Sequence, residues 1–403
     1  MKVLVFPHHL EIGGSQVNAV DLAAAVRDIY GHEVVFFATP GPGEALLESR
    51  GFRLIAAPRP RSSPSPSVAR ALRQAVRREG ADIVHAWDWP QCIDAFFGAQ
   101  LAGGVPIVGS IMSMVVPTFV PRSIPLTFGT PELLDEAKRR RRGKVSLLEP
   151  PVNTYLDDPS AIDGAASRAA FGVEDNDILV VGVSRLVGWM KLEGLLATLD
   201  AVDTLADQYR LRLLLVGEGS AEGQLRARAS EINDRHQRQV VTMPGALVDP
   251  RPAYAAADVV VGMGGSILRG MAFGKPAVVL GENGFACTFD EESSKTFLHK
   301  GFFGTEDVSA RVGTLREQLE KLCANPGRRD ALGAYSSRII RERFALPVLA
   351  ASVEQLYRET LNERVGRARL IGEGVKVLGR RAAAVALPNR AKAALRRVLK
   401  RSR

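Results

Sequence analysis

The segment Tyr254–Phe285, YAAADVVVGMGGSILRGMAFGKPAVVLGENGF, restricts the fold more than any other part of the sequence. An apolar run at Ala257–Val261 precedes a glycine-rich turn, a helical run and a second apolar run at Ala277–Leu280. This order predicts a βαβ unit whose loop lies at the carboxyl end of a parallel strand, where such folds bind ligands. Free N–H groups at a helix start attract phosphate, although a tight turn without a ligand fits the same pattern. The residues predicted to bind phosphate are Gly264, Gly265 and Ser266.

Strand and helix patterns alternate along most of the chain, which predicts an α/β protein with parallel sheets. A chain of 403 residues exceeds what one core usually supports, so two domains are expected. The polar stretch Pro150–Gly172 is predicted to link them. The predicted strands include Lys2–Phe6, Glu33–Ala38, Asp82–Ala86, Ile178–Val183 and Leu211–Val216.

The positive charge of the chain is concentrated near its carboxyl end. Residues 362–403 hold 13 Lys and Arg against two Asp and Glu, a net charge of +11, which leaves −2 of the total +9 for residues 1–361. Basic side chains surround an apolar stripe in Ala391–Leu399, which predicts an amphipathic helix on an anionic membrane surface. The basic run Lys138–Arg142 is expected to add to this surface. No aromatic residue interleaves the charges, so nucleic acid is not the expected partner, and a solvated disordered tail is the alternative.

The sequence lacks the patterns of a membrane-spanning, secreted or metal-binding protein. The sequence has no run of about 20 apolar residues and no signal-peptide layout. The three cysteines are scattered, and no His or Cys cluster has metal-ligand spacing, so we expect a reducing compartment, no metal and no cofactor. The predicted location is the cytoplasm, peripheral to the inner face of the plasma membrane of a bacterium.

Several sequence blocks together resemble GT-B-fold glycosyltransferases, most closely those of family four. They include EIGGSQVNAV at the first glycine loop, ADIVHAWDWP, VGVSRLVGWMKLEGL, LLLVGEGS and MAFGKPAVV. The resemblance implies two Rossmann-like domains that face each other across a cleft. It also implies a helix that packs back toward the first domain. The predicted parts are an acceptor domain at 1–155, a nucleotide-sugar domain at 156–345, this helix at 346–361 and the basic tail at 362–403.

The resemblance implies sugar transfer from a nucleotide diphosphate without a metal, so cations must neutralise the leaving group. Arg185 and Lys191 match the family's phosphate-binding pair, with Met190 as one extra residue between them. An exposed pair at a helix start is the alternative. Gly13 and Gly14 match the loop that approaches the donor phosphate from the other domain, or else form a plain turn.

Other matched positions are expected to contact the sugars. His85 and Asp88 are the predicted catalytic residues, since an imidazole at a strand end can deprotonate a hydroxyl. The alternative for His85 is a histidine packed in the sheet. The residues expected near the donor sugar or nucleoside are Glu282, Gly217 and Glu218.

The chain departs from the family where the donor sugar would bind. Two glutamates usual in the family are replaced by Val261 and Arg269, and the segment 110–113 lacks the usual histidine. Arg269 is expected to lie near the diphosphate or to face solvent.

The sequence therefore predicts a glycosyltransferase that uses a UDP- or GDP-sugar. The acceptor would be a lipid-linked glycan, a cell-surface polymer precursor or a small molecule. The alternatives are a catalytically silent GT-B protein that binds nucleotide sugar or glycan, and an epimerase or phosphorylase of the same fold.

Overall fold

The computed structural model describes residues 1–403 except 8, 12, 189, 305–312 and 387–403. Within it the chain forms two compact units, which are described separately. Unit 1 comprises residues 1–129, 133–148 and the chain from Ala350 onward, and unit 2 comprises residues 130–132 and 149–349. The chain thus changes unit between Leu148 and Glu149, just before the predicted linker Pro150–Gly172, whereas the sequence predicts the boundary after residue 155.

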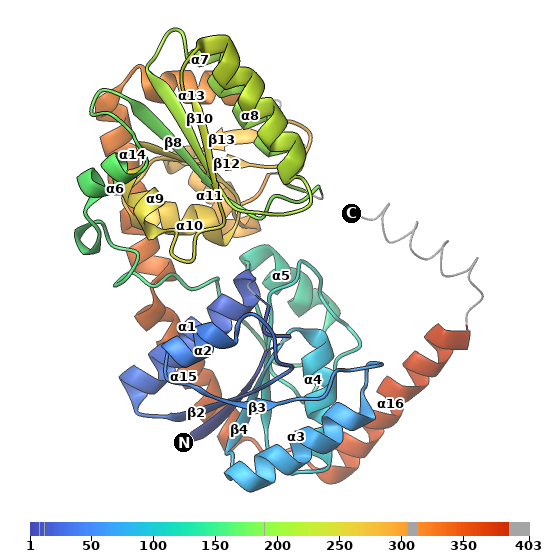
Figure 1. Ribbon diagram of the computed structural model, residues 1–403. Coiled ribbons are helices and arrows are strands. Elements are labelled where there is room, and N and C mark those ends of the chain that lie inside the picture. Colours follow the sequence, from blue (N-terminus) through green and yellow to red (C-terminus); the bar gives the residue numbers. More distant parts are fainter. Residues whose placement is uncertain (8, 12, 189, 305–312, 387–403) are drawn as a thin grey trace. The chain divides into compact units, whose positions relative to one another are not determined.

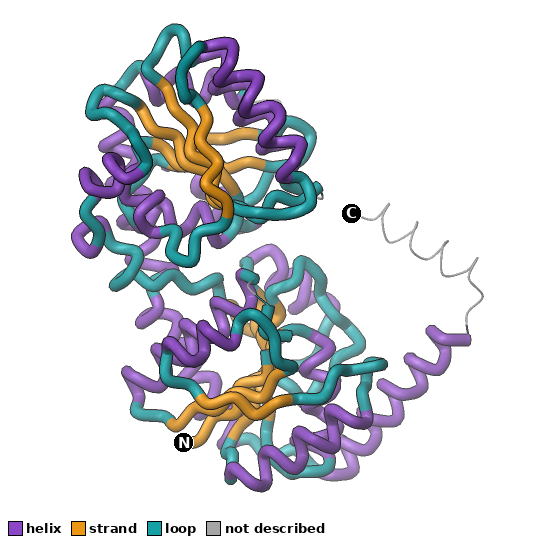
Figure 2. The backbone as a smooth tube through the Cα atoms, in the orientation of Figure 1, coloured by secondary structure: helices purple, strands orange, loops and turns teal. Residues whose placement is uncertain are grey.

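Unit 1 is built on a parallel sheet of seven strands in the order β3-β2-β1-β4-β5-β6-β7 (Figure 2). The chain moves outward from β1 to β3 on one side and from β4 to β7 on the other. Neighbouring β1 and β4 therefore form the switch point, where open α/β sheets bind ligands. The strands are β1 (Lys2–Phe6), β2 (Glu33–Ala38), β3 (Arg53–Ala56), β4 (Ile83–Trp87), β5 (Ile107–Ile111), β6 (Leu126–Phe128) and β7 (Val145–Leu147).

Helices cover both faces of this sheet. Along β4, Val84 and Ala86 face an apolar cluster shared with α3, α4 and η1. Successive strand residues point to opposite faces, so His85 faces the other side, where it meets Tyr357 of α15. The helices are α1 (Gly14–Tyr30), α2 (Glu44–Ser49), α3 (Pro66–Glu79), α4 (Trp89–Ala95), the π-helix η1 (Phe96–Leu101), α5 (Pro131–Arg140), α15 (Leu346–Asn362) and α16 (Arg367–Ala386).

Helix α16 occupies much of the predicted basic tail. Leu370 and Val377, two turns apart, are each only 7% exposed and belong to the apolar cluster of unit 1. A Cβ at Gly374, between them, would lie 3.5 Å from Phe96 and Leu101. The part of α16 between Leu370 and Val377 therefore packs on the rest of unit 1. The helix predicted at Ala391–Leu399 lies outside the described residues.

Unit 2 is built on a six-stranded sheet in the order β10-β9-β8-β11-β12-β13, parallel except for the last pair (Figure 1). Helices α7, α8 and α13 share one apolar cluster with the sheet, and α9, α10 and α11 share another. No described helix of the chain is both long and apolar enough to span a bilayer. The strands are β8 (Ile178–Val183), β9 (Leu211–Val216), β10 (Val241–Gly245), β11 (Val259–Gly262), β12 (Ala277–Leu280) and β13 (Ala286–Thr288). The helices are η2 (Pro159–Ala161), α6 (Gly164–Ala170), α7 (Leu192–Leu205), α8 (Glu222–His236), α9 (Arg251–Ala256), α10 (Gly265–Ala272), α11 (Glu291–Lys300), α13 (Leu315–Cys323), α14 (Pro326–Ile339) and the π-helix η3 (Ile340–Phe344).

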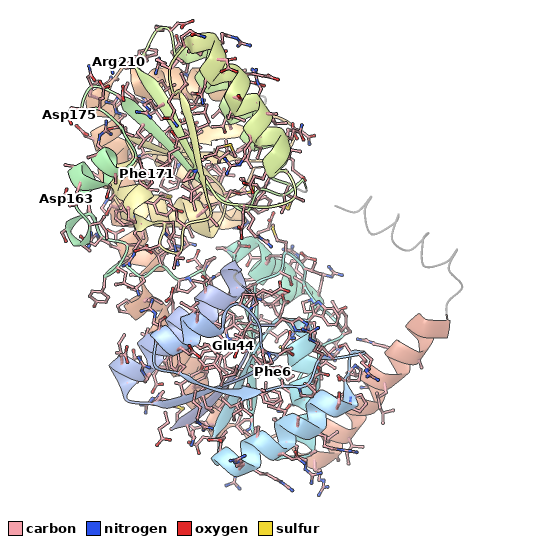
Figure 3. The ribbon with its side chains drawn as sticks, viewed as in Figure 1. Phe6, Glu44, Asp163, Phe171, Asp175 and Arg210 are labelled. Carbon is pink, nitrogen blue, oxygen red and sulfur yellow. The ribbon has the colours of Figure 1, made fainter. Side chains whose placement is uncertain are left out.

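The predicted linker Pro150–Gly172 is folded into unit 2. Val152 forms a parallel bridge with Ala345, and α6 lies against α9. The Asp163 carboxylate accepts the Ala166 N–H at 3.0 Å and thereby caps α6, which begins beside it (Figure 3). An aspartate-rich stretch thus supplies helix caps in addition to a connection.

Candidate functional site

Four loops of unit 2 meet at the carboxyl edge of its sheet. They follow β8, β9, β11 and β12, and their described residues are 184–188, 190–191, 217–219, 263–266 and 281–285. The strand order reverses between β8 and β11, so the loops after these two strands border the switch point. These loops contain every unit 2 residue that the sequence predicts to bind the donor.

The loop after β8 is held by close backbone contact with the loop after β9. The Leu186 N–H donates to the Glu218 carbonyl at 2.8 Å, and the Ala221 N–H donates to the Leu186 carbonyl at 2.8 Å. Gly217 has a φ of 144°, and a Cβ there would lie 1.8 Å from the Ser184 carbonyl oxygen. Only glycine allows this approach. Gly217 therefore positions the segment that carries Arg185, and the Glu218 side chain is exposed.

Arg185 and Lys191 form a pair of neighbouring cations. Arg185 is exposed and Lys191 is half-buried. Burial and the charge of Arg185 both lower the pKa of Lys191, because each disfavours a second positive charge. Neither side chain forms an ion pair with any described residue. Met190 between them has a φ of +62°, a strained conformation of the kind that clusters at functional sites.

The glycine loop after β11 leads into α10 without a side-chain cap. Gly264 has a φ of +61°, and its N–H donates to the Phe302 carbonyl at 2.6 Å. The direction of a Cβ at Gly265 is open, with no atom within 4 Å. The hydroxyl of Ser266 donates to the Met263 carbonyl at 3.0 Å, which leaves its oxygen as an acceptor. The loop thus presents the start of α10 with free N–H groups and open space.

The loop containing Glu282 forms hydrogen bonds with the start of α7 and with the segment 302–304 that also contacts the glycine loop. The Asn283 N–H donates to the Glu193 carboxylate at 2.9 Å, two residues beyond Lys191. The Glu282 N–H contacts the Gly304 carbonyl at 3.4 Å, in the same segment whose Phe302 carbonyl binds Gly264. The Glu282 side chain is exposed at this edge. Sequence reasoning missed Glu193 and the segment 302–304, because these contacts join parts of the chain that carry no motif.

Arg269 lies on α10, beyond the glycine loop. Its guanidinium lies 3.7 Å from the carboxylate of Asp157, which is only 3% exposed. The residue that replaces a family glutamate thus ties α10 to the segment that enters unit 2. The sequence leaves two positions open for Arg269, near the diphosphate or facing solvent. The side chain is half-buried, so it does not simply face solvent.

Unit 1 presents a second cluster at the switch point of its own sheet. Gly13 is the N-terminal cap residue of α1 after β1, and Asp88 follows the adjacent β4. Asp88 has φ 68° and ψ 165°, a region that non-glycine residues avoid. One of its carboxylate oxygens accepts the Trp89 N–H at 3.1 Å and the Ser113 hydroxyl at 2.9 Å. Asp88 is thus a half-buried carboxylate whose position is fixed by hydrogen bonds. At Gly14, which follows Gly13, an added Cβ would meet no atom within 4 Å.

His85 lies deeper in β4 and is only 2% exposed. Its Nδ1 lies 2.7 Å from the Tyr357 hydroxyl, and its Nε2 lies 2.7 Å from the hydroxyl of Ser110, which also accepts from Thr127. Burial lowers the pKa of His85 to about 3, so the ring is neutral near pH 7. Both ring nitrogens have partners inside unit 1. This geometry favours the histidine packed in the sheet over the predicted base.

The predicted residues therefore form one group in each unit. In unit 2, two cations lie at the edge that also presents the free start of α10, and this combination suits a diphosphate. In unit 1, a carboxylate and a glycine loop follow the adjacent strands β4 and β1, and the carboxylate can orient or deprotonate a hydroxyl. The unit 2 group comprises Arg185, Lys191, Gly217, Glu218, Gly264, Gly265, Ser266 and Glu282, and the unit 1 group comprises Gly13, Gly14 and Asp88.

Comparisons with known proteins match these two units to two family models. Glycosyltransferase family 4 matches residues 12–142, and glycosyl transferases group 1 match residues 176–315. None of the curated proteins matches the chain in sequence.

Solved structures share the fold at low identity. A glycosyltransferase from Rickettsia africae ESF-5 is 15% identical, with a TM-score of 0.71 over 90% of this chain and 99% of its own. Anabaena Alr3699/HepE in complex with UDP is 16% identical, with a TM-score of 0.68 over 89% of this chain and 100% of its own. WaaG, a glycosyltransferase involved in lipopolysaccharide biosynthesis, is 15% identical, with a TM-score of 0.58 over 90% of this chain and 100% of its own. With both family models matched in order and the GT-B fold present, the chain belongs to the GT-B glycosyltransferases, of the family 4 and group 1 type.

Proposed function

We propose that the protein transfers a sugar from a nucleotide-diphosphate sugar, UDP- or GDP-linked, to a hydroxyl of a glycan, lipid-linked or small-molecule acceptor. The observation that carries the proposal is the Arg185–Lys191 pair, two cations without a described carboxylate partner at the edge where α10 begins. The leaving nucleoside diphosphate gains negative charge as the glycosidic bond breaks, and fixed cations stabilise that charge. Anabaena HepE, which shares the fold, has been solved with UDP and with UDP-glucose.

On the acceptor side, Asp88 is the proposed base or orienting group. The Trp89 N–H and the Ser113 hydroxyl hold one carboxylate oxygen in place, and the second oxygen is available to an acceptor hydroxyl. Asp88→Asn keeps the size and the cap but removes the base. It should abolish sugar transfer in a donor-turnover assay while UDP affinity stays within twofold of the wild type.

The donor site is tested by calorimetric titration with UDP. Arg185→Ala should weaken UDP binding at least tenfold, since a charge-assisted phosphate contact contributes about 1.5–3 kcal/mol. The matched control is Arg210→Ala. Arg210 is an exposed arginine just before β9, at the opposite edge of the same sheet, where it pairs with Asp177 and Glu174 (Figure 3). Equal affinity of the Arg185 variant and the wild type would place the diphosphate elsewhere.

A catalytically silent nucleotide-sugar protein is the second candidate. The residues in place of the two family glutamates favour it, because Val261 carries no charge and Arg269 lies against Asp157. Turnover across a panel of UDP- and GDP-sugars separates the candidates: release of nucleoside diphosphate supports the transferase, whereas binding without release supports the silent protein.

We further propose that the protein works at the inner face of a bacterial membrane, held by the basic residues of 362–403. The charge distribution supports this, since residues 1–361 are close to neutral. Anionic lipid attracts such a segment, and added salt should weaken the binding.

A further inference from the structure

A cavity of about 540 Å³ lies in unit 1 between α16 and the chain that follows β5. One wall is the segment 118–122, and the other is the side of α16 that carries Arg369, Lys376 and Arg380. Arg142, beyond the end of α5, also lines it. Residues from three distant parts of the sequence thus form one concave surface, far from any motif.

The lining of this cavity is strongly basic. It contains five arginine or lysine residues and one carboxylate, Glu373. That carboxylate accepts the Ser123 N–H at 3.1 Å and the Nε of Arg369 at 3.3 Å. Arg122, Arg142 and Lys376 form no hydrogen bond or ion pair with the described residues. Five cations gathered in a concavity with a single carboxylate favour an anionic ligand.

The wall at 118–122 is held in place from beneath. Arg141, only 6% exposed, donates to the carbonyls of Val120, Pro121 and Ile124 at 2.8, 2.6 and 2.7 Å. On the other side, Arg380 donates to the Thr118 carbonyl at 3.1 Å and so ties the wall to α16. Because both attachments use fixed backbone carbonyls, the cavity is shaped before any ligand arrives.

The outward side of α16 is apolar where water would favour polar residues. Ile371, Val375 and Leu378 are 52%, 65% and 50% exposed, at the spacing of one helical stripe. A helix with an exposed apolar stripe and flanking cations is typical of the membrane interface. Nucleic acid would gain nothing from aliphatic side chains and would need exposed aromatic rings for stacking.

We propose that this cavity holds the phosphate headgroup of an anionic phospholipid while Ile371, Val375 and Leu378 enter the lipid interface. The inference rests on the proposed membrane association and names a site for it on the folded chain. It extends the sequence-based prediction, which already included Arg142 in the run Lys138–Arg142, by adding Arg122 and by placing these residues around one cavity with α16.

The test measures binding of the full chain to vesicles by co-sedimentation, with phosphatidylglycerol and phosphatidylcholine mixed or with phosphatidylcholine alone. The double variant Arg122→Gln/Arg142→Gln keeps residues 362–403 intact. It should bind the mixed vesicles at least tenfold more weakly, because each basic residue at an anionic surface contributes a several-fold factor. The matched control is Arg70→Gln/Arg73→Gln on α3, two exposed arginines of the same unit, which should bind like the wild type.

Two further experiments distinguish the contribution of the cavity from that of the apolar stripe. Glycerol 1-phosphate should displace the wild type from vesicles better than sodium chloride at equal ionic strength, because it competes for the cavity. Val375→Gln should also weaken vesicle binding, whereas its thermal midpoint should not change.

Three outcomes would overturn the proposal: wild-type vesicle binding by the Arg122/Arg142 variant, an equal loss in the Arg70/Arg73 control, or tighter binding to single-stranded RNA than to vesicles at matched salt. UDP titration of the same variants distinguishes a defect in donor binding from a defect in vesicle binding. Vesicle binding is measured without donor, so a failure of UDP binding or sugar transfer counts against the proposed function alone.

Discussion

At the scale of single residues, His85 shows how a fold can neutralise a titratable group. Its partners Tyr357 and Ser110 are both hydroxyls, which can bond a neutral ring but supply no charge to balance an imidazolium. Since burial lowers the pKa of His85 from 6.5 to about 3, the folded state resists protonation that the unfolded state accepts. The stability contributed by the neutral ring is therefore complete above pH 6.5 and falls as the pH drops toward 3.

This reasoning gives a pH prediction. Between pH 6.5 and about pH 5, before most carboxylates titrate, the wild type should lose unfolding free energy more steeply than His85→Gln, by at most about 1.4 kcal/mol per pH unit. Urea unfolding at several pH values measures both slopes. Parallel slopes for the two proteins would mean that folding does not lower the pKa of His85.

At the scale of elements, α16 has a buried stripe and an exposed stripe one residue apart. Leu370 packs against unit 1, whereas Ile371 is half exposed. Leu370→Ala should therefore cost about 2–5 kcal/mol of unfolding free energy, and Ile371→Ala should cost under about 0.5 kcal/mol. Thermal or urea unfolding of the two variants tests the docking of α16, and equal losses would contradict it.

Local patterns predicted many elements of this fold well. The strands at Lys2–Phe6, Ile178–Val183 and Leu211–Val216 are found with the predicted bounds. Each has a continuous apolar run or a regular spacing that needs no distant partner. The candidate donor loops could be located from sequence because glycines and cations follow such strands directly.

The docking of α16 could not be predicted in the same way. Between Leu370 and Val377 lie two exposed apolar residues, two glycines, a glutamate and a lysine, and the burial of this pair depends on Phe96 and Leu101, more than 250 positions away. The partners of His85 and Glu282 were missed for the same reason, since Tyr357 and Gly304 become neighbours only through tertiary packing. These contacts cannot be predicted from the spacing of residues along the chain.

At the scale of the whole molecule, the two units differ in how the chain completes them. Unit 2 is nearly continuous, from Glu149 to Leu349, and contains two apolar clusters of its own. Unit 1 is discontinuous, because α15 and α16 return to it from the far end of the described chain.

The fragment 149–349 should therefore fold alone and bind UDP through Arg185 and Lys191. The fragment 1–148 should not unfold cooperatively, since it lacks Tyr357 over His85 and Leu370 over the apolar cluster. Circular dichroism during heating compares the two fragments. A cooperative transition for 1–148 would show that α15 and α16 are dispensable.

The return of the chain to unit 1 also sets an order of events on the ribosome. Strands β1 to β7 emerge first, yet the helices that close their sheet are made only after about 200 residues of unit 2 have been translated, roughly 10–40 s later at ordinary rates. During that interval the newly made first half exposes apolar surface to the cytosol, while the second half can already fold. A chaperone that shields nascent chains should thus raise the yield of this protein more than that of a circular permutant that begins at residue 350.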